Sequence, residues 1–188
     1  MSQFVRYPVQ LLHVSSRQPI EAQLCSLQPK HLNDFEQYWK PILLGSSEED
    51  QYWNWKQKQR TYGNRLGAEA YTIECEQMTQ GLMLIETLGH RSWLEPNRRI
   101  VYVHSLATAP WNRPSIQNPP WYRLSGTVLL LFARQRSEEL GYKGGVGLHA
   151  LPDAEDFYRR LGMIDGGQDA EKDNLTYFER LPLPTPEE

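Results

Sequence analysis

The chain has 188 residues, with 20 Lys and Arg against 23 Asp and Glu, a formal net charge of −3 and a sequence pI of about 6.0. This length fits one domain with a core of ordinary size, and the acidic balance argues against a broad nucleic-acid-binding surface, although not against a local basic groove. Hydrophobic residues at 39% and charged residues at 23% fit a globular protein, and no stretch approaches the ~20 apolar residues of a membrane span.

The cysteines and the N-terminal residues bear on the cellular compartment. Cys25 and Cys75 follow no metal-ligand spacing and are too few for a disulfide framework, so a reducing, cytoplasmic environment and no metal are expected. Residues 1–14 are interrupted by Arg6 and Pro8 and lack the continuous apolar run of a signal peptide.

The first third of the chain contains two predicted strands and two predicted helices. Residues 3–14 are expected to form an edge strand or a surface arm, and residues 20–28 a strand. A helix is predicted from Pro29 to about Trp39, with Pro41 ending it. A second helix is predicted from a capping box at residues 47–50 to about Tyr62. The side expected to pack on the sheet consists of Tyr52, Trp55, Gln59 and Tyr62, while Lys56, Lys58 and Arg60 lie on other sides.

The pattern in the middle of the chain predicts a hairpin followed by a central strand. Alternation over residues 68–76 and 81–88 predicts two antiparallel strands joined by a turn at residues 77–80. Residues 99–109 are almost continuously apolar, which is typical of a strand in the middle of a sheet. Residues 111–120 contain three prolines and are expected to form a surface excursion of fixed shape.

The last third of the chain is organised around a long helix. Small polar residues at 124–127 run directly into the apolar residues 128–133, which predicts a helix that ends at Gly141. Such a helix N-terminus attracts anions, above all phosphate. A short strand over 144–150 and a helix capped by Asp153, with Asp156 in capping-box register, are predicted next, and Gly162 closes that helix. Residues 165–172 are expected to form a polar loop, 174–181 a closing strand and 182–188 a frayed tail.

This order of elements resembles the core of the GNAT superfamily of acyl-CoA-dependent N-acyltransferases over roughly residues 70–180. The family signature Arg/Gln-x-x-Gly-x-Gly/Ala is matched by Arg123, Gly126 and Val128, with valine where the family has glycine or alanine. The ending Phe-Tyr-x-x-Leu-Gly at 157–162 is the closer match. The resemblance implies an α/β (α+β) fold with a mixed, mostly antiparallel sheet of about six to seven strands, about four flanking helices, and strands four and five splayed apart. It also implies a single domain over 1–188, with an N-terminal arm over about 1–15.

The same resemblance implies an N-acetyltransferase that uses acetyl-CoA and an amine acceptor, by direct attack on the thioester. Because the first two helices commonly border the acceptor in this family, it also offers an alternative to core packing for the aromatic side of the second helix, as a wall of the acceptor site. It assigns the pantetheine arm to the main chain of Leu106, Ala107 and Thr108. It places the diphosphate at the helix start, formed by Arg123, Leu124, Ser125, Gly126, Thr127 and Val128. Either Arg123 or Arg113 could add a bidentate cation. The family's asparagine seven residues before the tyrosine is Leu151 here, so His149 or Ser105 is a candidate replacement for that cofactor or water contact.

The resemblance also suggests catalytic residues. Tyr158 occupies the position of the acid that protonates the CoA thiolate, although a tyrosine on an amphipathic helix is often a packing residue. Candidates for the base that deprotonates the amine are Glu86, His104 and His149, with a satisfied core histidine as the plain alternative for His104. Arg99 stands near a position where some protein-lysine acetyltransferases carry a glutamate, which places that subclass in doubt.

Two other functions are compatible with the sequence. The replacements at Val128 and Leu151 favour a non-catalytic GNAT-fold module that binds acyl-CoA or a partner protein. A toxin-type acetyltransferase acting on aminoacyl-tRNA would need a positive groove, which the charge balance does not favour. The sequence leaves open the acceptor, a small-molecule or a protein amine, and the oligomeric state, a homodimer included.

Overall fold

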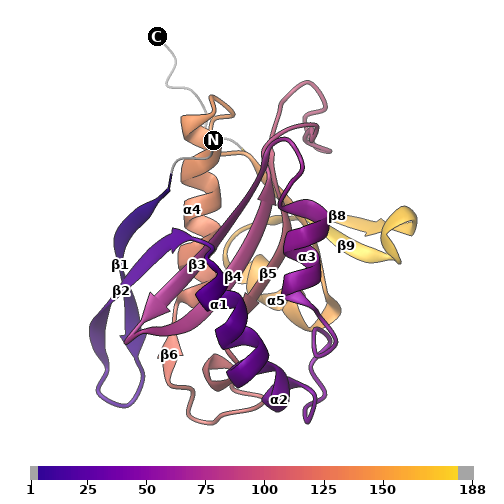
Figure 1. Cartoon of the computed structure of the whole chain (residues 1–188). Helices are drawn as coiled ribbons and strands as arrows, with labels where there is room; N and C mark the ends of the chain where they lie inside the picture. The colour runs from indigo at the N-terminus through magenta and orange to yellow at the C-terminus, as the bar shows by residue number, and fades with distance from the viewer. Residues whose placement is uncertain (1–3, 182–188) are drawn as a thin grey trace. The chain divides into compact units, whose positions relative to one another are not determined.

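The computed structural model describes residues 4–181, so the predicted tail over 182–188 lies outside the described residues (Figure 1). Within residues 4–181, nine strands form one sheet in the order β6-β1-β2-β3-β4-β5-β7-β9-β8. The strands are β1 Arg6–His13, β2 Gln18–Ser26, β3 Ala68–Cys75, β4 Met78–Glu86, β5 Val101–Thr108, β6 Tyr122–Arg123, β7 Val146–Ala150, β8 Ile164–Asp169 and β9 Leu175–Arg180. The helices are α1 Pro29–Asp34, α2 Lys40–Leu43, α3 Trp55–Tyr62, α4 Ser125–Glu139 and α5 Glu155–Arg160.

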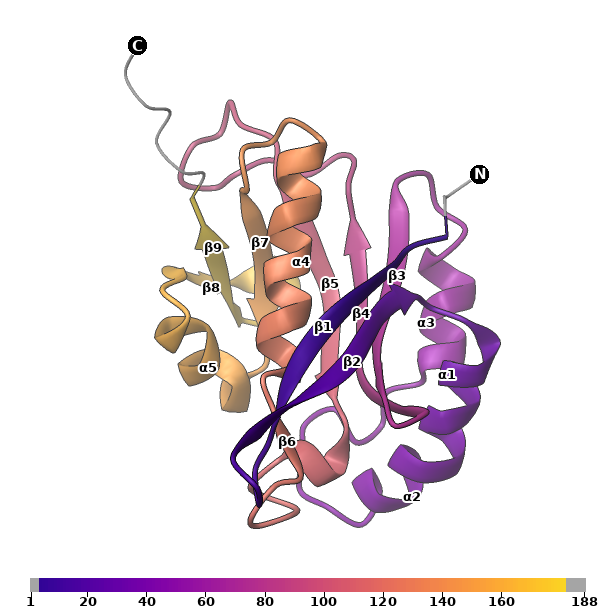
Figure 2. The ribbon, with the colours of Figure 1, turned by 90° about the vertical axis from the view of Figure 1, so that its left-hand side faces the viewer.

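The fold class is the expected one, a mixed sheet in which β5 and β7 are parallel and most other pairs are antiparallel. The sheet has nine strands rather than six or seven because two short elements were predicted as loops. β6 consists of two residues that pair with Leu12 and His13 at the end of β1 (Figure 2). β8 has the sequence IDGGQD, whose polar and glycine residues show no apolar alternation, and all but its last residue are exposed.

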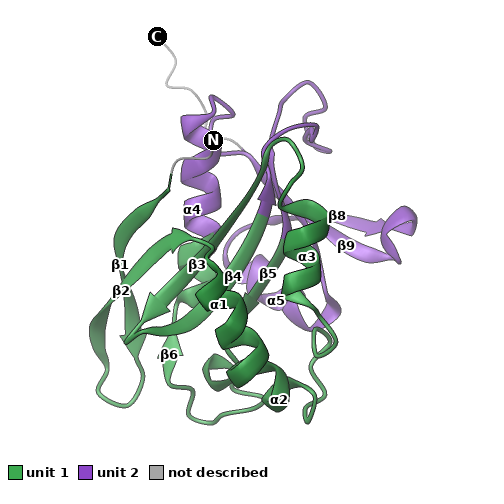
Figure 3. Ribbon diagram, viewed as in Figure 1, with its two compact units in different colours: residues 1–84, 105–129 green, residues 85–104, 130–188 purple. Residues whose placement is uncertain are grey.

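The chain divides into two compact units (Figure 3). Unit 1 comprises Met1–Leu84 and Ser105–Leu129, and unit 2 comprises Ile85–His104 and Leu130–Glu188. Strands β4 and β5 and helix α4 each contribute residues to both units.

The core of unit 1 is rich in tryptophan. Trp39 and Trp111 meet edge to face, with their ring centroids 6.2 Å apart, and both indoles have buried hydrogen-bond acceptors. Trp39 Nε1 donates to the carbonyl of Thr79 at 3.1 Å, and Trp111 Nε1 donates to Oε1 of Gln80 at 2.9 Å. Residues 111–120 are therefore not simply a surface excursion, because Trp111 anchors their first residue in the core.

Pro41 does not end the first helix as predicted. The helix passes through a π-helical turn at Phe35–Trp39 and continues as α2 to Leu43. Pro41 lacks an N–H group, so it cannot donate in an α-helical ladder. The chain instead widens by one residue, and the Lys40 N–H donates to the carbonyl of Phe35.

The predicted capping box at residues 47–50 does not form, and α3 begins only at Trp55. Asn54 caps it, with its Oδ1 accepting from the Gln57 N–H at 2.9 Å. The carboxylates of Glu48 and Asp50 bind Arg113 instead, at 2.8 Å and 2.6 Å. A long-range ion pair thus replaces the local cap that the sequence favoured.

The hairpin of β3 and β4 is tighter than expected. Glu76 and Gln77 both have left-handed backbones, with φ of 49° and 62°, and together they form a two-residue turn. Strand β4 consequently starts at Met78, within the residues 77–80 that were predicted as the turn.

In unit 2, β9 lies between β7 and β8, and α5 packs beside it through Tyr158 and Phe178, whose ring centroids are 5.7 Å apart. Asp153 does not cap α5: a 3-10 turn at Pro152–Ala154 precedes the helix, and the N-cap residue is Ala154. At Gly147 in β7 an added Cβ would lie 2.7 Å from Ile100 Cδ1 and would meet the Tyr177 hydroxyl, so only glycine fits.

Candidate functional site

The first turn of α4 presents unpaired donors. Leu124 has a left-handed backbone, with φ of 80°, and its carbonyl accepts from the Val128 N–H at 2.8 Å. That bond is the first of the helix, so the N–H groups of Ser125, Gly126 and Thr127 precede the ladder and have no acceptor among the described residues. Val128 departs from the expectation, because its N–H is used within the helix.

The side chain of Ser125 adds a further unpaired group at this turn. The residue is 3% exposed, and its Oγ has no hydrogen-bond partner among the described residues. Buried hydroxyls are nearly always paired, so an orphan one needs an explanation. Three free N–H groups, a buried hydroxyl and the positive end of the helix dipole all favour an anion at this position.

Gly81 in β4 allows this turn to lie close to the strand. A Cβ at Gly81 would be 2.9 Å from Leu129 Cδ1 and 3.7 Å from Ser125 Cβ. A larger residue would push the first turn of α4 outward. The glycine and the helix start therefore form one local arrangement within unit 1.

The cation predicted at Arg113 is wrong, because its guanidinium is already saturated. It donates to both oxygens of Asp50, at 2.6 Å and 2.7 Å, to Glu48 at 2.8 Å, and through Nε and Nη2 to the Thr108 carbonyl. The acidic partners hold the pKa of Arg113 above its usual value against the effect of burial. The Thr108 carbonyl, one of the predicted main-chain contacts, is thus occupied by Arg113. Arg123 is exposed in β6.

Strand β5 extends well beyond its parallel ladder with β7. The ladder comprises Val101↔Val146, Tyr102↔Gly147 and Val103↔Leu148, and β5 then continues to Thr108. The ladder with β7 thus ends at Val103, before the end of β5. Ser105 and Ala107 have buried side chains, whereas His104, Leu106 and Thr108 are half-buried.

Tyr158 lies in α5 with its ring buried against Phe157 and Phe178. The residue is 6% exposed, and burial raises the pKa of its phenol well above the usual value. No described group forms a hydrogen bond with the hydroxyl. Tyr158 is therefore a neutral phenol whose proton has no acceptor among the described residues of unit 2.

Glu86 is not an isolated carboxylate, because its Oε2 lies 2.5 Å from Nε2 of His90. His90 in turn stacks on Tyr102, with the ring centroids 4.4 Å apart and the planes at 15°. Sequence reasoning missed His90. Its position four residues after Glu86 was a weak signal, since the two lie on a strand end and a loop rather than on a helix.

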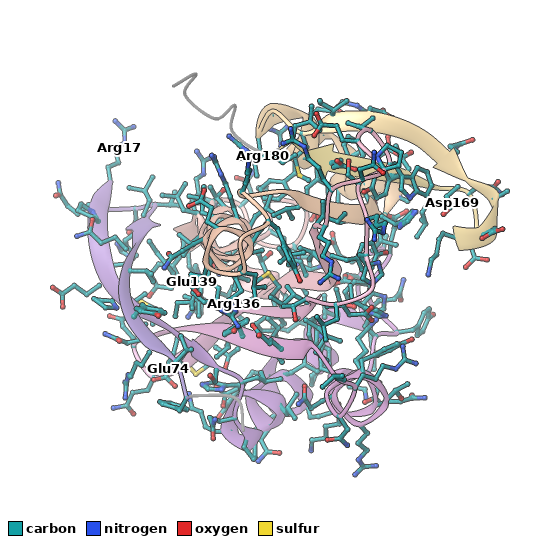
Figure 4. All side chains as sticks on the ribbon, turned by 90° about the horizontal axis from the view of Figure 1, so that it is seen from above. Arg17, Glu74, Arg136, Glu139, Asp169 and Arg180 are labelled. Atoms are coloured by element: carbon teal, nitrogen blue, oxygen red, sulfur yellow. The ribbon has the colours of Figure 1, made fainter. Side chains whose placement is uncertain are left out.

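His149 is held at both ring nitrogens. Its Nδ1 lies 2.8 Å from the hydroxyl of Tyr102, and its Nε2 lies 3.0 Å from Oδ2 of Asp169, which is labelled in Figure 4. Burial lowers the pKa of His149 although Asp169 opposes the shift, and burial raises the pKa of Tyr102 to about 12. A contact from His149 to a cofactor would require one of these bonds to break.

The predicted residues thus fall into two groups. Unit 1 contains the main-chain candidates in β5 and the helix start, while unit 2 contains Glu86, His104, His149 and Tyr158. Within unit 2, a series of side-chain contacts runs from Glu86 through His90, Tyr102 and His149 to Asp169. It connects two candidate residues, Glu86 and His149. Among residues 4–181, no three His, Cys, Asp or Glu side chains form a metal-binding group, and no helix is long and apolar enough to cross a membrane.

Comparison with solved structures identifies the fold. The chain resembles the PaiA N-acetyltransferase of Thermoplasma acidophilum in complex with coenzyme A, with a TM-score of 0.57, 14% identity, and coverage of 85% of this chain and 98% of that one. It also resembles Ard1 of Thermoplasma volcanium (TM-score 0.56, 13% identity, 87% and 99% covered) and a GNAT-family acetyltransferase of Listeria monocytogenes (0.54, 12%, 92% and 99%). No protein-family model and no curated protein matches the sequence.

The chain therefore has the fold of the GNAT acetyltransferases. At identities of 12–14% the likeness establishes the fold, and the chemistry must be argued from the residues of this chain.

Proposed function

We propose that this protein is an acyl-CoA-dependent N-acyltransferase that transfers an acetyl group from acetyl-CoA to an amine by direct attack on the thioester. The observation that carries the proposal is the start of α4, where three unpaired N–H groups accompany the orphan hydroxyl of Ser125. The diphosphate of coenzyme A is an anion of the kind that such a helix start binds.

The residues present fit coenzyme A in two further respects. The main chain of Leu106 and Ala107 lies beyond the β5–β7 ladder, where a pantetheine amide can pair with it. Arg123, two residues before Ser125, adds an exposed cation. When bound, acetyl-CoA supplies an electrophilic carbonyl and a thiolate leaving group.

The surroundings of Tyr158 support its proposed role as the catalytic acid. Tyr158 is protonated at neutral pH and has no internal acceptor, which suits an acid that gives its proton to the thiolate. An amine acceptor must lose a proton before it attacks. Glu86 with its partner His90, and His104, are the candidates for this base.

The test is calorimetric titration with coenzyme A, followed by measurement of thiol release from acetyl-CoA with a panel of amines. Saturable binding and amine-dependent release are expected. Binding without release for any amine would favour the non-catalytic module. Absence of binding would remove the enzymatic proposal and leave only the fold.

A further inference from the structure

Lys58 occupies an unexpected place for a lysine. Helix α3 was expected to direct Lys58 away from the sheet, but its Nζ donates to Oγ of Ser105 in β5 at 3.0 Å. Lys58 lies three residues after Trp55, which is 1% exposed, so the two share the sheet-facing side of the helix. All of these residues belong to unit 1.

The ammonium group of Lys58 is only partly satisfied. It has three donors, and among residues 4–181 it meets one hydroxyl and the face of Trp53, whose ring centroid lies 4.1 Å from Nζ. Asp50 acts on it electrostatically, but both oxygens of Asp50 are bound by Arg113. No carboxylate among the described residues lies within ion-pair distance of Lys58.

A cation held in this way favours an anionic partner. Burial lowers the pKa of Lys58, which shows that its environment disfavours the charge. A desolvated charge without a counter-ion is costly, and a carboxylate that joined it would recover part of that cost. The free donors of Lys58 are therefore a place for an anion from outside the chain.

The position of Lys58 separates this anion from the diphosphate of coenzyme A. Side chains alternate between the two faces of a strand. Ala107 follows Ser105 on the same face of β5, and it belongs with Leu82 of β4 to the same buried cluster as Trp55. Gly81 lies on the other face, against Leu129 in the first turn of α4. Within unit 1, Lys58 and the start of α4 thus lie on opposite faces of the sheet.

We infer that Lys58, with Ser105 and Trp53, forms a carboxylate-recognition site for the acceptor, so that the acceptor is an amine that also carries an acidic group. This inference rests on the proposed acetyltransferase function. It identifies the substrate class, which the sequence left open. The aromatic ring beside the ammonium suits the aliphatic part of such an acceptor.

A binding experiment tests the site without turnover. Protein labelled with 13Cε-lysine is titrated with succinate and, as an uncharged match, with succinamide. The Lys58 signal, assigned with Lys58→Arg, is expected to shift saturably with succinate and not with succinamide. Lys56, on another side of the same helix, is the control and is expected to stay unchanged. If Lys58 shows no saturable response, or responds as Lys56 does, the inference is wrong.

A kinetic experiment then links the site to the reaction. Pairs of amines that differ only in a carboxylate or a carboxamide are compared as acceptors. Lys58→Met is expected to raise KM for the carboxylate amine by roughly 10- to 100-fold, the value of one charge-assisted bond, and to leave the carboxamide amine unchanged. Lys58→Arg should restore part of the difference. Binding of succinate at Lys58 without thiol release from acetyl-CoA would refute the enzymatic proposal but retain the anion site. Turnover without discrimination between the paired amines would refute the carboxylate-recognition site alone.

Discussion

Replacing Ser125 by alanine separates binding from stability, because the two are expected to change in opposite directions. The hydroxyl is buried and has no partner, so its removal relieves a desolvation penalty. The free protein should gain about 1 kcal/mol, which for a chain of this size raises Tm by about 2–4 °C. Coenzyme A, however, should lose one charge-assisted hydrogen bond of about 1.5–3 kcal/mol, so that its Kd rises roughly 10- to 100-fold.

Ser137 provides a matched control in the same helix. It is also fully buried, but its Oγ donates to the carbonyl of Gly145 at 2.7 Å. Ser137→Ala should therefore destabilise the protein by about 1 kcal/mol and leave the affinity for coenzyme A unchanged. Thermal unfolding and calorimetry of both variants measure these quantities. If Ser125→Ala lowers Tm as Ser137→Ala does and binds coenzyme A as the wild type does, then the Ser125 hydroxyl is not a partner of the diphosphate.

Four further outcomes are expected. Tyr158→Phe should leave stability within about 0.5 kcal/mol, since the phenol has no internal partner, yet lower kcat about 100-fold with unchanged affinity for coenzyme A; an unchanged kcat would exclude the acid role. Gly147→Ala should cost about 1–3 kcal/mol in denaturant unfolding, because the methyl group meets Tyr177, and a neutral result would contradict the packing described. Arg113→Met leaves two carboxylates unpaired and should cost about 3–5 kcal/mol by the same assay, with a loss below 1 kcal/mol counting against it. Because burial lowers the pKa of His149 in the folded protein, the imidazole is protonated first in the unfolded chain as the pH falls. The contribution of His149 to the free energy of unfolding should therefore be complete above about pH 6.5 and be lost as the pH drops through the folded-state pKa. His149→Gln should flatten this pH dependence of the free energy of unfolding, and an equal slope in both proteins would disprove the assignment.

The sequence predicted those elements whose signals are local. The apolar run after Ser125, the positive-φ glycine at Gly141 and the alternation in β5 each depend on neighbouring residues, and each led to the element that the structure contains. The fold class followed from their order.

The errors occurred where a distant partner decided the conformation. Residues 47–50 had the pattern of a capping box, but Arg113, more than 60 positions away, binds the two carboxylates. Strand β8 forms because it pairs with the edge of β9, although its own glycine-rich sequence favours a loop. Such pairings cannot be seen in one sequence.

The candidate site was predictable only in outline. The residue types at 123–128 indicated an anion site, but neither the left-handed backbone at Leu124 nor the orphan Ser125 hydroxyl follows from them. Lys58 was predicted on another side of its helix than the side that packs on the sheet. Its spacing of three residues from Trp55 was the signal that could have placed it beside that buried side chain, where it donates to Ser105.

The most direct test of the central idea is an NMR titration of backbone amides with coenzyme A and, separately, with pantetheine, which lacks the diphosphate. If the start of α4 holds the diphosphate, the amide signals of Ser125, Gly126 and Thr127 should shift strongly with coenzyme A and little with pantetheine. Equal shifts with both ligands, or shifts confined to other parts of the chain, would contradict the account.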